Sequence, residues 1–469
     1  MHNIHFLAHG WRARRDAGFD REGVVAVAAA LGVVWGTICE GAAIVVGYDT
    51  RFDSREDARL VAGLLASCGL EVRVSTSACP APVLEWSVAR DDSCVGGVYV
   101  SGGDYSSDYG GLMACGPDGG SPDKAFVQDV DKLIATCPSE ELGPFAWVDL
   151  VDDYVGALLG EVDAGAIADL APRVVVDSMY GTAHFVVPAL LRRLGCDVIE
   201  IRAQDGSDFG GIHPEPVDPW VDACERSVRQ NGADLGISFG ATCRRLALVD
   251  ASGRMVSTHV LPPMVLGHLV EGRGRAGRVV GTLACSARLG RQAQRLGLDC
   301  TSVPVGFSRL YDEMSDGDVL LAAEEYGGLA FPWHLAERDA ILEALYILEL
   351  AATSRMSVAQ LVERIASQIG RMSYGREDIG LDIAKVQSFR NILPGLNPHA
   401  MAGLTPIAVS HADGLKVSFE DDSWALLRPS RAHPLVRAYA EAPTLEGKDN
   451  LLTAAEKIVR DGLAGEAAG

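Results

Sequence analysis

Residues 173–201 read RVVVDSMYGTAHFVVPALLRRLGCDVIEI, and this stretch decides the fold class. It holds a β-branched run at Arg173–Asp177, a helical stretch at Ala183–Leu194 and a second apolar run at Asp197–Ile201. Continuous apolar runs that alternate with helical stretches are typical of parallel strands covered by helices on both faces of the sheet. The stretch therefore predicts a β–α–β unit of an α/β domain.

The same unit occurs twice more, at a spacing of roughly 105 to 130 residues. The strand, helix and second strand of these copies are expected at Ala43–Gly47, Asp57–Cys68 and Glu71–Val74, and at Arg278–Leu283, Ser286–Leu296 and Asp299–Val305. Because this spacing is too long for a solenoid repeat, it predicts three similar α/β domains in tandem.

The end of the chain has a different pattern. After about Arg371, the runs Lys416–Phe419 and Trp424–Arg428 indicate short antiparallel strands, and a final helix is expected from about Leu445. We therefore expect an α/β protein with mixed sheets, in which three α/β domains at residues 1–150, 151–255 and 256–370 precede an α+β domain at residues 371–469.

The composition limits the partners. Asp and Glu number 63 against 41 Lys and Arg, which gives a formal charge of −22. Such a charge repels nucleic acids and anionic membranes, but a local arginine cluster can still bind an anionic small molecule. No apolar run reaches the roughly 18 residues that a membrane span needs, so the run Val24–Trp35 is predicted to be a buried helix. The eleven cysteines form no CxxC pair, which favours reduced thiols in a cytoplasmic protein and argues against a zinc site.

Six segments between these elements carry the residues that are most informative about function. They are HGWRA at 9–13, GYDTRFDS at 47–54, GGVYVSGGDYSSDYGG at 96–111, GADLGISFGATCRRLALVD at 232–250, AAEEYGG at 322–328 and RPSRAHPLVRAYAEA at 428–442. Their sequences and their order resemble the loops of the α-D-phosphohexomutases, the family of phosphoglucomutase and phosphomannomutase. The resemblance covers nearly the whole chain and implies that family's four-domain, heart-shaped fold, with an active-site cleft where four loops converge.

The loop at residues 96–111 is similar to the loop that carries the family's catalytic phosphoserine. Active members read T-A-S-H-N-P there, and the serine passes its phosphoryl group to the sugar. When the flanking glycines are aligned, residues 101–106 occupy these six positions, so that Gly103 stands at the nucleophile and Asp104 follows it. Glycine has no group to phosphorylate. A shift of the loop would offer a substitute nucleophile, although serines in a glycine-rich turn are more typical of turn residues; the candidates are Ser101, Ser106 and Ser107.

The segment 232–250 is similar to the family's metal loop, D-G-D-[AG]-D-R, whose three carboxylates hold Mg²⁺. Residues 240–245 read GATCRR at these positions, and Thr242 alone cannot form the oxygen cage that Mg²⁺ needs. We therefore predict that the chain binds no metal and uses no cofactor. Arg244 and Arg245 leave two alternatives: they hold a phosphate by charge-assisted hydrogen bonds, or they neutralise nearby acids in a disused cleft.

The other two loops keep more of the family's pattern. Glu324 and Glu325 match the acidic residues that accept hydrogen bonds from sugar hydroxyls, whereas Tyr326 replaces a serine and either stacks on a sugar ring or fills its place. The resemblance implies that the last loop holds the non-reacting phosphate. Its matching residues are Arg428, Ser430 and Arg437. Arg431, which replaces a glycine of the family, adds charge to this loop.

The side chains that serve the family as acid or base are not kept either. The lysine after the serine loop is Met113, and the histidine sometimes found after the sugar loop is Gly328. Arg12 remains in the first loop, but arginine is a poor base at its usual pKa.

These losses together predict a phosphohexomutase-like protein that is inactive as a mutase and still binds a phosphorylated small molecule, with a sugar phosphate as the leading candidate. Two alternatives stay open. An enzyme with altered, metal-independent isomerase or lyase chemistry would use Asp104, Arg244, Arg245 and Glu325 on a phosphorylated substrate. An interaction protein would pair with an active enzyme or with a second copy of this chain, and its effects would be insensitive to changes in the cleft.

Overall fold

The computed structural model describes residues 4–8, 10–38, 41–134, 141–204, 206–430 and 433–466. The chain divides into two compact units, each built from more than one segment of the sequence. The first unit consists of Met1–Thr258, Tyr311–Ala322 and Tyr326–Leu361, and the second of His259–Leu310, Ala323–Glu325 and Val362–Gly469. The domain boundaries expected near residues 150, 255 and 370 remain a prediction.

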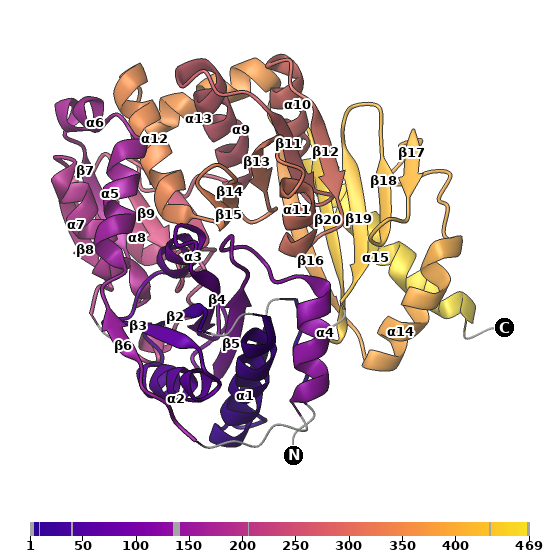
Figure 1. Ribbon diagram of the computed structural model, residues 1–469. Helices are drawn as coiled ribbons and strands as arrows, with labels where there is room; N and C mark the ends of the chain where they lie inside the picture. The colour runs from indigo at the N-terminus through magenta and orange to yellow at the C-terminus, as the bar shows by residue number, and fades with distance from the viewer. Residues whose placement is uncertain are drawn as a thin grey trace. The chain divides into compact units, whose positions relative to one another are not determined.

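The first sheet of the first unit is mixed and has six strands (Figure 1). In spatial order they are β1 (Trp11–Arg14), β5 (Tyr109–Cys115), β4 (Cys94–Val100), β2 (Ala43–Tyr48), β3 (Glu71–Ser75) and β6 (Ala146–Val148). β2 pairs in parallel with β3 and β4, whereas β5 runs antiparallel to β4 and β1. Every residue of β2 is buried, as its uninterrupted apolar sequence predicted.

Helices cover both faces of this sheet. In Figure 1, α1 (Arg21–Ile38) and α2 (Ser54–Ser67) lie on one side of the strands and α3 (Ala81–Ala89) lies on the other, while α4 (Lys124–Leu133) packs beside α1. The helix expected at Asp57–Cys68 is α2, which begins three residues earlier. The first predicted α/β copy is therefore confirmed.

The helix expected at Val24–Trp35 is α1, and it is longer than expected. Its 18 residues have a mean hydropathy of 1.4, so by length and composition alone α1 could cross a membrane, and the expectation that no segment reaches this length is wrong. In the fold, 61 % of this window is buried, and Val27, Leu31 and Trp35 belong to the core of the first sheet. The helix thus has the surroundings of a core helix, as the sequence predicted.

The second sheet of the first unit has the spatial order β10 (Leu246–Asp250), β9 (Leu235–Phe239), β7 (Arg173–Asp177) and β8 (Asp197–Ile201). β7 pairs in parallel with β8 and β9, which confirms the β–α–β unit predicted for residues 173–201. The single helix expected at Ala183–Leu194 is instead divided into η1 (Thr182–Phe185) and α7 (Val187–Arg193). Pro188 explains the break, because proline is tolerated in the first turn of a helix but not in its interior. The other helices of this region are α5 (Val151–Glu161), α6 (Ala164–Leu170), η2 (Phe209–Gly211) and α8 (Asp222–Asn231).

The third α/β copy follows the same scheme. In the second unit, β11 (Arg278–Thr282) and β12 (Cys300–Val303) pair in parallel, and α10 (Ala287–Arg295) connects them. In the first unit, β14 (Leu329–Phe331) and β15 (Leu335–Arg338) pair antiparallel. The remaining elements of this region are α9 (Leu261–Gly267), α11 (Phe307–Met314), β13 (Val319–Ala323), α12 (Ala340–Ser354) and α13 (Val358–Ile369).

The end of the second unit is β-rich. Its antiparallel sheet has the order β16 (Ser373–Gly380), β20 (Leu435–Ala442), β19 (Trp424–Pro429), β18 (Leu415–Ser418) and β17 (Ala408–Ser410), and the helices are α14 (Ile383–Ile392) and α15 (Leu445–Glu466). The strands expected at Lys416–Phe419 and Trp424–Arg428 are β18 and β19, and the final helix begins at Leu445 as expected. The sequence did not reveal β16, because its residues SYGREDIG carry no apolar run.

Three of the informative loops follow the carboxyl ends of strands in the first unit. Residues 49–54 follow β2, residues 101–108 follow β4 and residues 240–245 follow β9. In α/β sheets, ligands bind in the crevice outside the carboxyl ends of the strands. The fold therefore places these loops where a binding site is expected.

A buried aspartate organises the start of α12. The side chain of Asp339 caps the helix by accepting the N–H groups of Ile341 (2.9 Å) and Leu342 (3.1 Å). It also accepts the hydroxyl of Tyr154 at 2.8 Å and lies 2.9 Å from Nε2 of His334. Asp339 is fully buried, so each of these groups depends on it for a partner.

We predict that Asp339→Ala lowers the free energy of unfolding by about 3–5 kcal/mol, because it removes a helix cap and leaves buried polar groups without a partner. Tyr154→Phe, which deletes a single hydroxyl, should lower it by about 1 kcal/mol. Denaturant unfolding of both variants measures the difference. Equal effects of the two substitutions would contradict this role of Asp339.

We also predict that His259 makes the second unit sensitive to acid. Its ring stacks on Tyr374, with the ring centroids 3.6 Å apart, and burial together with Arg288 lowers the pKa of His259 to about 3. The unfolded chain takes up this proton near pH 6.5, so the stabilisation present above pH 6.5 is lost as the pH falls toward 3. His259→Phe keeps an aromatic ring that cannot be protonated, and should lose less stability between pH 6.5 and 4 in denaturant titrations. Parallel pH curves for the two proteins would refute the prediction.

Candidate functional site

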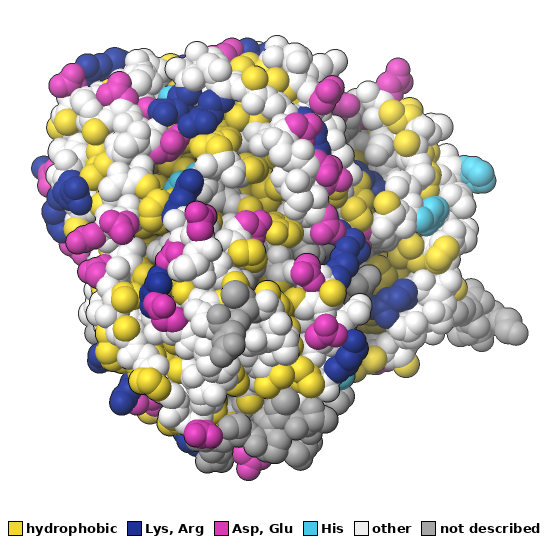
Figure 2. All heavy atoms as spheres, in the orientation of Figure 1, with side chains coloured by type: hydrophobic (Ala, Val, Ile, Leu, Met, Phe, Trp, Pro, Cys, Tyr) yellow, Lys and Arg dark blue, Asp and Glu magenta, His cyan; other side chains and the backbone are white. Residues whose placement is uncertain are grey.

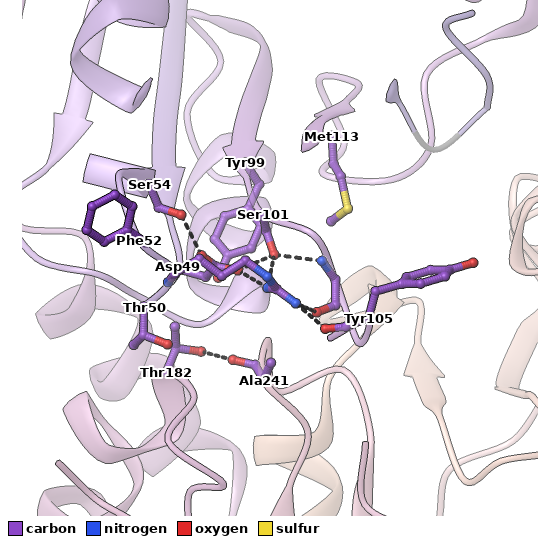
Figure 3. A network of polar contacts seen from close by, with 12 residues as sticks. Asp49, Thr50, Phe52, Ser54, Tyr99, Ser101, Tyr105, Met113, Thr182 and Ala241 are labelled. Atoms are coloured by element: carbon purple, nitrogen blue, oxygen red, sulfur yellow. Dashed lines mark hydrogen bonds and ion pairs between the residues drawn. The ribbon is translucent and has the colours of Figure 1, made fainter. Parts of the chain in front are cut away.

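A buried ion pair forms the base of the candidate site (Figure 3). Asp49, directly after β2, lies against the guanidinium of Arg51, and both side chains are completely excluded from solvent. Asp49 also accepts hydrogen bonds from the hydroxyl groups of Ser54 (2.8 Å) and Ser101 (2.6 Å). Both carboxylate oxygens therefore have donors, as a buried carboxylate requires, whereas Nε of Arg51 is buried without a hydrogen-bond partner.

Arg51 fixes the shape of the loop at residues 101–107. Its Nη2 donates to the carbonyl oxygen of Gly103 at 2.8 Å and to that of Tyr105. Its guanidinium also lies 4.8 Å from the ring centroid of Phe209, which belongs to the region of the second sheet. The loop that resembles the phosphoserine loop is thus held by a side chain that is itself immobilised.

The nucleophile position is built for glycine. Gly103 has a φ of 66°, in the left-handed region that other residues rarely adopt. A Cβ atom at this position would lie 3.0 Å from Nη2 of Arg12, which is tighter than an ordinary contact. A serine at residue 103 would therefore be strained by its backbone and crowded by Arg12.

Two of the three candidate serines have structural contacts. Ser101 is 1 % exposed, and its hydroxyl donates to Asp49 while it accepts the N–H of Gly103 at 2.9 Å. The hydroxyl of Ser106 donates to Asp108 in the same turn. These are the contacts of turn residues, which the sequence favoured over a substitute nucleophile.

Residues 240–245 form the turn between β9 and β10. The N–H of Gly240 donates to the carbonyl oxygen of Arg245 at 3.0 Å and closes the turn. The carbonyl oxygens of Thr242 and Cys243 accept the N–H groups of the first residues of α3 and α12, at 3.1 and 3.0 Å. The backbone of the turn is therefore committed to the N-termini of two helices.

The donor set of this turn does not fit Mg²⁺. This ion needs several carboxylate or carbonyl oxygens, whereas the side chains of residues 240–245 include no carboxylate and two arginines. Burial raises the pKa of the Cys243 thiol, and sulfur is in any case a ligand for softer metals than Mg²⁺. Across the part of the chain that the structure describes, no group of three or more His, Cys, Asp or Glu side chains is arranged to hold a metal ion.

Arg244 extends from the turn onto a carboxylate of α3. Its Nη2 contacts Oε1 of Glu85, and the two side chains are 14 % and 3 % exposed. Burial raises the pKa of Glu85 to about 7, against the opposing effect of Arg244. Burial would likewise raise the pKa of Glu337, but the neighbouring Arg338 and Arg244 reverse this and lower it. The charge of Arg244 is thus balanced by carboxylates of the protein.

Arg245 joins the two degenerate loops directly. Its Nη1 donates to Oδ2 of Asp104 at 2.9 Å and lies 3.6 Å from Oε1 of Glu215. The side chains of Arg245 and Asp104 are 18 % and 19 % exposed, so solvent screens this pair only in part. The other carboxylate oxygen of Asp104 lies 3.3 Å from the position that a Cβ of Gly240 would occupy. The two loops therefore meet through an ion pair between side chains.

Arg12, on β1, has no carboxylate within ion-pair distance among the described residues. Its Nη2 donates to Sδ of Met113 at 3.3 Å, and its guanidinium lies 4.8 Å from the ring centroid of Tyr105. Arg244 contacts the same sulfur at 3.9 Å, so Met113, at the family's lysine position, lies between two arginines. Burial lowers the pKa of Arg12, although Tyr105 and Asp104 act in the opposite direction.

These contacts bear on the two alternatives left open for Arg244 and Arg245. Both side chains are paired with carboxylates of the chain, which supports the alternative that they neutralise acids. Arg12 lies in the same cluster. In the described part of the chain, no carboxylate accepts a hydrogen bond from its guanidinium. The structure thus brings together Arg12, Asp104, Arg244 and Arg245, while their binding roles remain predictions.

The predicted sugar-loop residues lie at the end of β13. Glu324 and Glu325 belong to the second unit and are 8 % and 7 % exposed. Oε2 of Glu325 accepts the hydroxyl of Thr282 at 3.0 Å. Tyr326 is half-buried and belongs to the first unit. Their roles toward a sugar stay predictions.

The predicted phosphate loop follows β19 in the second unit. Arg428 donates through Nε to Asp413 at 2.7 Å and through Nη2 to the carbonyl oxygen of Val305 at 3.2 Å. The hydroxyl of Ser430 accepts the N–H of His433 at 3.0 Å. Arg428 and Ser430 are therefore held in place by the chain's own groups.

Two further residues were predicted for the phosphate loop. Arg437, on β20, lies 3.9 Å from a carboxylate oxygen of Asp378, a distance at which the attraction is weak. Arg431 lies outside the described residues. The phosphate-binding roles of both remain predictions.

Sequence reasoning missed the carboxylates that pair with the arginines. Glu85 is the single charged residue of the apolar helix APVLEWSVA, and this isolation was an available signal. Asp49 and Arg51 lie in the segment 47–54. Its resemblance to a loop of the phosphohexomutases did not assign a role to either residue. Glu215 and Glu337 carry no local signal, because their partners are brought to them only by tertiary packing.

Comparison with protein families finds three matching models that together cover well over half of the chain. Residues 3–140, 152–253 and 264–368 match the models described as phosphoglucomutase/phosphomannomutase, alpha/beta/alpha domains I, II and III. Their order along the chain is the order of the three α/β copies. The two α/β sheets of the first unit lie within the first and second matches, apart from the short edge strand β6.

Individual relatives are similar over nearly their whole length. A phosphoglucomutase/phosphomannomutase from Thermococcus kodakarensis is 26 % identical over 449 residues, which are 93 % of this chain and 94 % of that protein. A candidate phosphomannomutase from Thermus thermophilus, known from a crystal structure, is 27 % identical in sequence to this chain. The two structures superpose with a TM-score of 0.88, over 98 % of this chain and 99 % of that one. An N-acetylphosphoglucosamine mutase from Aspergillus fumigatus, solved with GlcNAc-6P and magnesium, shares the fold at 12 % identity and a TM-score of 0.59, over 98 % of this chain and 96 % of that one.

We predict that Asp104 and Arg245 stabilise the protein jointly. A double-mutant cycle with Asp104→Asn and Arg245→Gln should give a coupling energy of about 1 kcal/mol or more, since the pair is partly shielded from solvent. The measurement is denaturant unfolding of the four proteins. The exposed pair Arg14–Asp16 is the control, with an expected coupling of a few tenths of a kcal/mol. Coupling no larger than that of the control would show that the two loops are joined by other contacts.

Proposed function

Because the chain belongs to the α-D-phosphohexomutase superfamily, we propose that it is a member without mutase activity that binds a sugar phosphate or a related phosphorylated small molecule. The family relation supplies the class of ligand. The loops of this chain supply the argument against the reaction.

The ion pair between Arg245 and Asp104 is the observation that carries the proposal. In the family, the two corresponding loops supply the phosphoryl donor and the ligands of Mg²⁺. In this chain Gly103 has no atom to phosphorylate, and the turn at residues 240–245 has an arginine pairing with the neighbouring loop in place of a carboxylate cage.

The chemistry of phosphoryl transfer explains why both losses matter. The donor must be held in line with the acceptor, and the charge that develops must be stabilised; each contribution lowers the barrier by several kcal/mol. Arg244 and Arg245 cannot replace the metal's charge without giving up Glu85 and Asp104, whose buried or half-shielded charges would then be unpaired. We infer that neither Arg244 nor Arg245 is available as a compensating cation for the mutase step.

Binding of a phosphorylated ligand is a separate requirement, and Arg12 supports it. Its guanidinium is not neutralised by a contacting carboxylate of the described residues, and charge-assisted hydrogen bonds from arginine to phosphate are among the stronger ones in proteins. In the second unit, the buried Glu325 and Ser430 match the family's pattern by the resemblance of their loops. We propose that they contribute to recognition of the sugar and of its phosphate.

We also propose a small-molecule partner and a cytoplasmic location for the protein. On the face shown in Figure 2, acidic and basic side chains are scattered and form no large patch of one sign, which supports a small-molecule partner over nucleic acid. No disulfide joins the nine cysteines in the described residues, which supports a reducing, cytoplasmic location. Pairing with an active enzyme or with a second copy stays an alternative that a ligand-binding measurement separates from the proposal.

We predict that the purified protein carries no covalent phosphate and does not interconvert glucose 1-phosphate and glucose 6-phosphate, with or without Mg²⁺. Intact-protein mass spectrometry and a coupled turnover assay test the two statements. Gly103→Ser should stay inactive, because φ at this position disfavours a side chain and the metal ligands are still absent. A phosphorylated serine together with Mg²⁺-dependent turnover would overturn the proposal.

Ligand binding is tested by thermal unfolding with glucose 1-phosphate and glucose 1,6-bisphosphate. A ligand at about 100 times its dissociation constant stabilises a protein by roughly 2.7 kcal/mol, whereas Mg²⁺ is expected to give no shift. Arg12→Gln should weaken the effect, and Arg14→Gln, on the same strand but exposed to solvent, should not. Stabilisation that survives Arg12→Gln would remove Arg12 from the site, and no stabilisation by any sugar phosphate would favour the interaction protein.

A further inference from the structure

A cavity of about 230 Å³ lies in the second unit, away from the predicted phosphate loop. It is lined by β11, the start of α10, β12 and the strands β18 and β19, and its wall includes Thr282, Cys285, Lys416 and Trp424. Trp424 begins β19 and Ser430 follows its end, so the cavity and that loop are separated by roughly 20 Å of extended strand. Binding pockets for drug-sized molecules span roughly 300–1,000 Å³, so this cavity suits a smaller molecule.

Lys416 supplies the chemically distinctive group of the cavity. Its Nζ donates to the carbonyl oxygen of Leu283 at 2.6 Å and lies 4.4 Å from the ring centroid of Trp424. No carboxylate lies within ion-pair distance of this amine in the described part of the chain. A basic group in these surroundings is held in position without being neutralised.

The other lysines differ from Lys416 in this respect. The chain has only six lysines among its 41 basic residues, because arginine is used nearly everywhere else. Each of the other five lies within ion-pair distance of an aspartate; the pairs are Lys124–Asp312, Lys132–Asp129, Lys385–Asp382, Lys448–Asp449 and Lys457–Asp461. Lys416 is therefore exceptional both in its environment and in lacking a counter-ion among the described residues.

Lysine can do what arginine cannot: it can lose its proton near neutral pH and act as a nucleophile. Burial lowers the pKa of Lys416 to about 8, against weaker opposing effects of Cys285 and Glu441. A substantial fraction of the amine is therefore neutral at physiological pH. The hydroxyls of Ser302 and Ser418 line the same cavity and have no hydrogen-bond partner among the described residues.

We propose that this cavity binds a small polar aldehyde or ketone, which Lys416 holds as a reversible Schiff base. The neutral amine nitrogen adds to the carbonyl carbon, and the carbonyl oxygen leaves as water with the two hydrogens of the amine, so that a C=N bond forms without any oxidant. Protonation of the imine from solvent gives a cation. Its N–H can still donate to the carbonyl oxygen of Leu283, and its positive charge lies over the face of the Trp424 ring. Ser302 and Ser418 can donate hydrogen bonds to hydroxyl groups of the ligand.

Reductive trapping tests the proposal independently of the proposed function. The full-length protein is incubated with limiting glyceraldehyde and cyanoborohydride at about pH 7.5, half a unit below the lowered pKa of Lys416, and the labelled lysines are identified by peptide mass spectrometry. Lys416 should be labelled at least about tenfold faster than Lys385, whose side chain is 62 % exposed and paired with Asp382. The rate at Lys416 should rise with pH and reach half of its maximum near pH 8.

Two variants provide the controls. Lys416→Arg keeps the positive charge but cannot form the imine, and should abolish the fast phase of labelling, whereas Lys385→Arg should leave it unchanged. Labelling of Lys416 at the same rate as the exposed lysines, or a fast phase that persists in Lys416→Arg, would overturn the proposal. The comparison between lysines within the unmodified protein decides the question even where Lys416→Arg does not fold.

Discussion

A carboxylate and a guanidinium that are both excluded from water depend on hydrogen bonds from their surroundings to offset the loss of hydration. Both oxygens of Asp49 obtain such bonds from Arg51, Ser54 and Ser101, and the two Nη groups of Arg51 reach Asp49 and the backbone of the loop at residues 101–107, while its buried Nε has no partner. The shape of that loop is therefore a consequence of the pair. Arg51 holds the carbonyl of Gly103 in a left-handed turn, and this backbone conformation disfavours a serine at the position.

The charges above this base are arranged in pairs. Arg244 lies on Glu85 and Arg245 on Asp104, so neighbouring carboxylates balance the positive charge of the turn at residues 240–245. A site of this kind attracts anions less than its number of arginines suggests. What remains for a ligand in this cluster is a single cationic side chain, Arg12.

The sequence predicted the architecture well because β-branched runs and helical stretches are local patterns. Residues 173–201 show what such patterns predict and what they miss. The two parallel strands were predicted correctly, but the single helix predicted between them is divided at Pro188. The site could be predicted only where family motifs aligned, as at Gly103. The partners of the arginines were not predictable, because Glu85 is separated from Arg244 by 159 positions of the chain and only packing brings them together.

The pairing also distinguishes a rebuilt site from a decayed one. Two arginines at this turn without counter-ions would cost several kcal/mol for each one that is buried. In this chain Arg244 meets a glutamate from an otherwise apolar helix, and Arg245 meets Asp104, the residue after Gly103. The position of a Cβ at Gly240 lies 3.3 Å from a carboxylate oxygen of Asp104, so a carboxylate there would meet a like charge, and one in place of Arg244 would leave Glu85 facing a like charge. The ion pairs therefore oppose a carboxylate at either position of the turn.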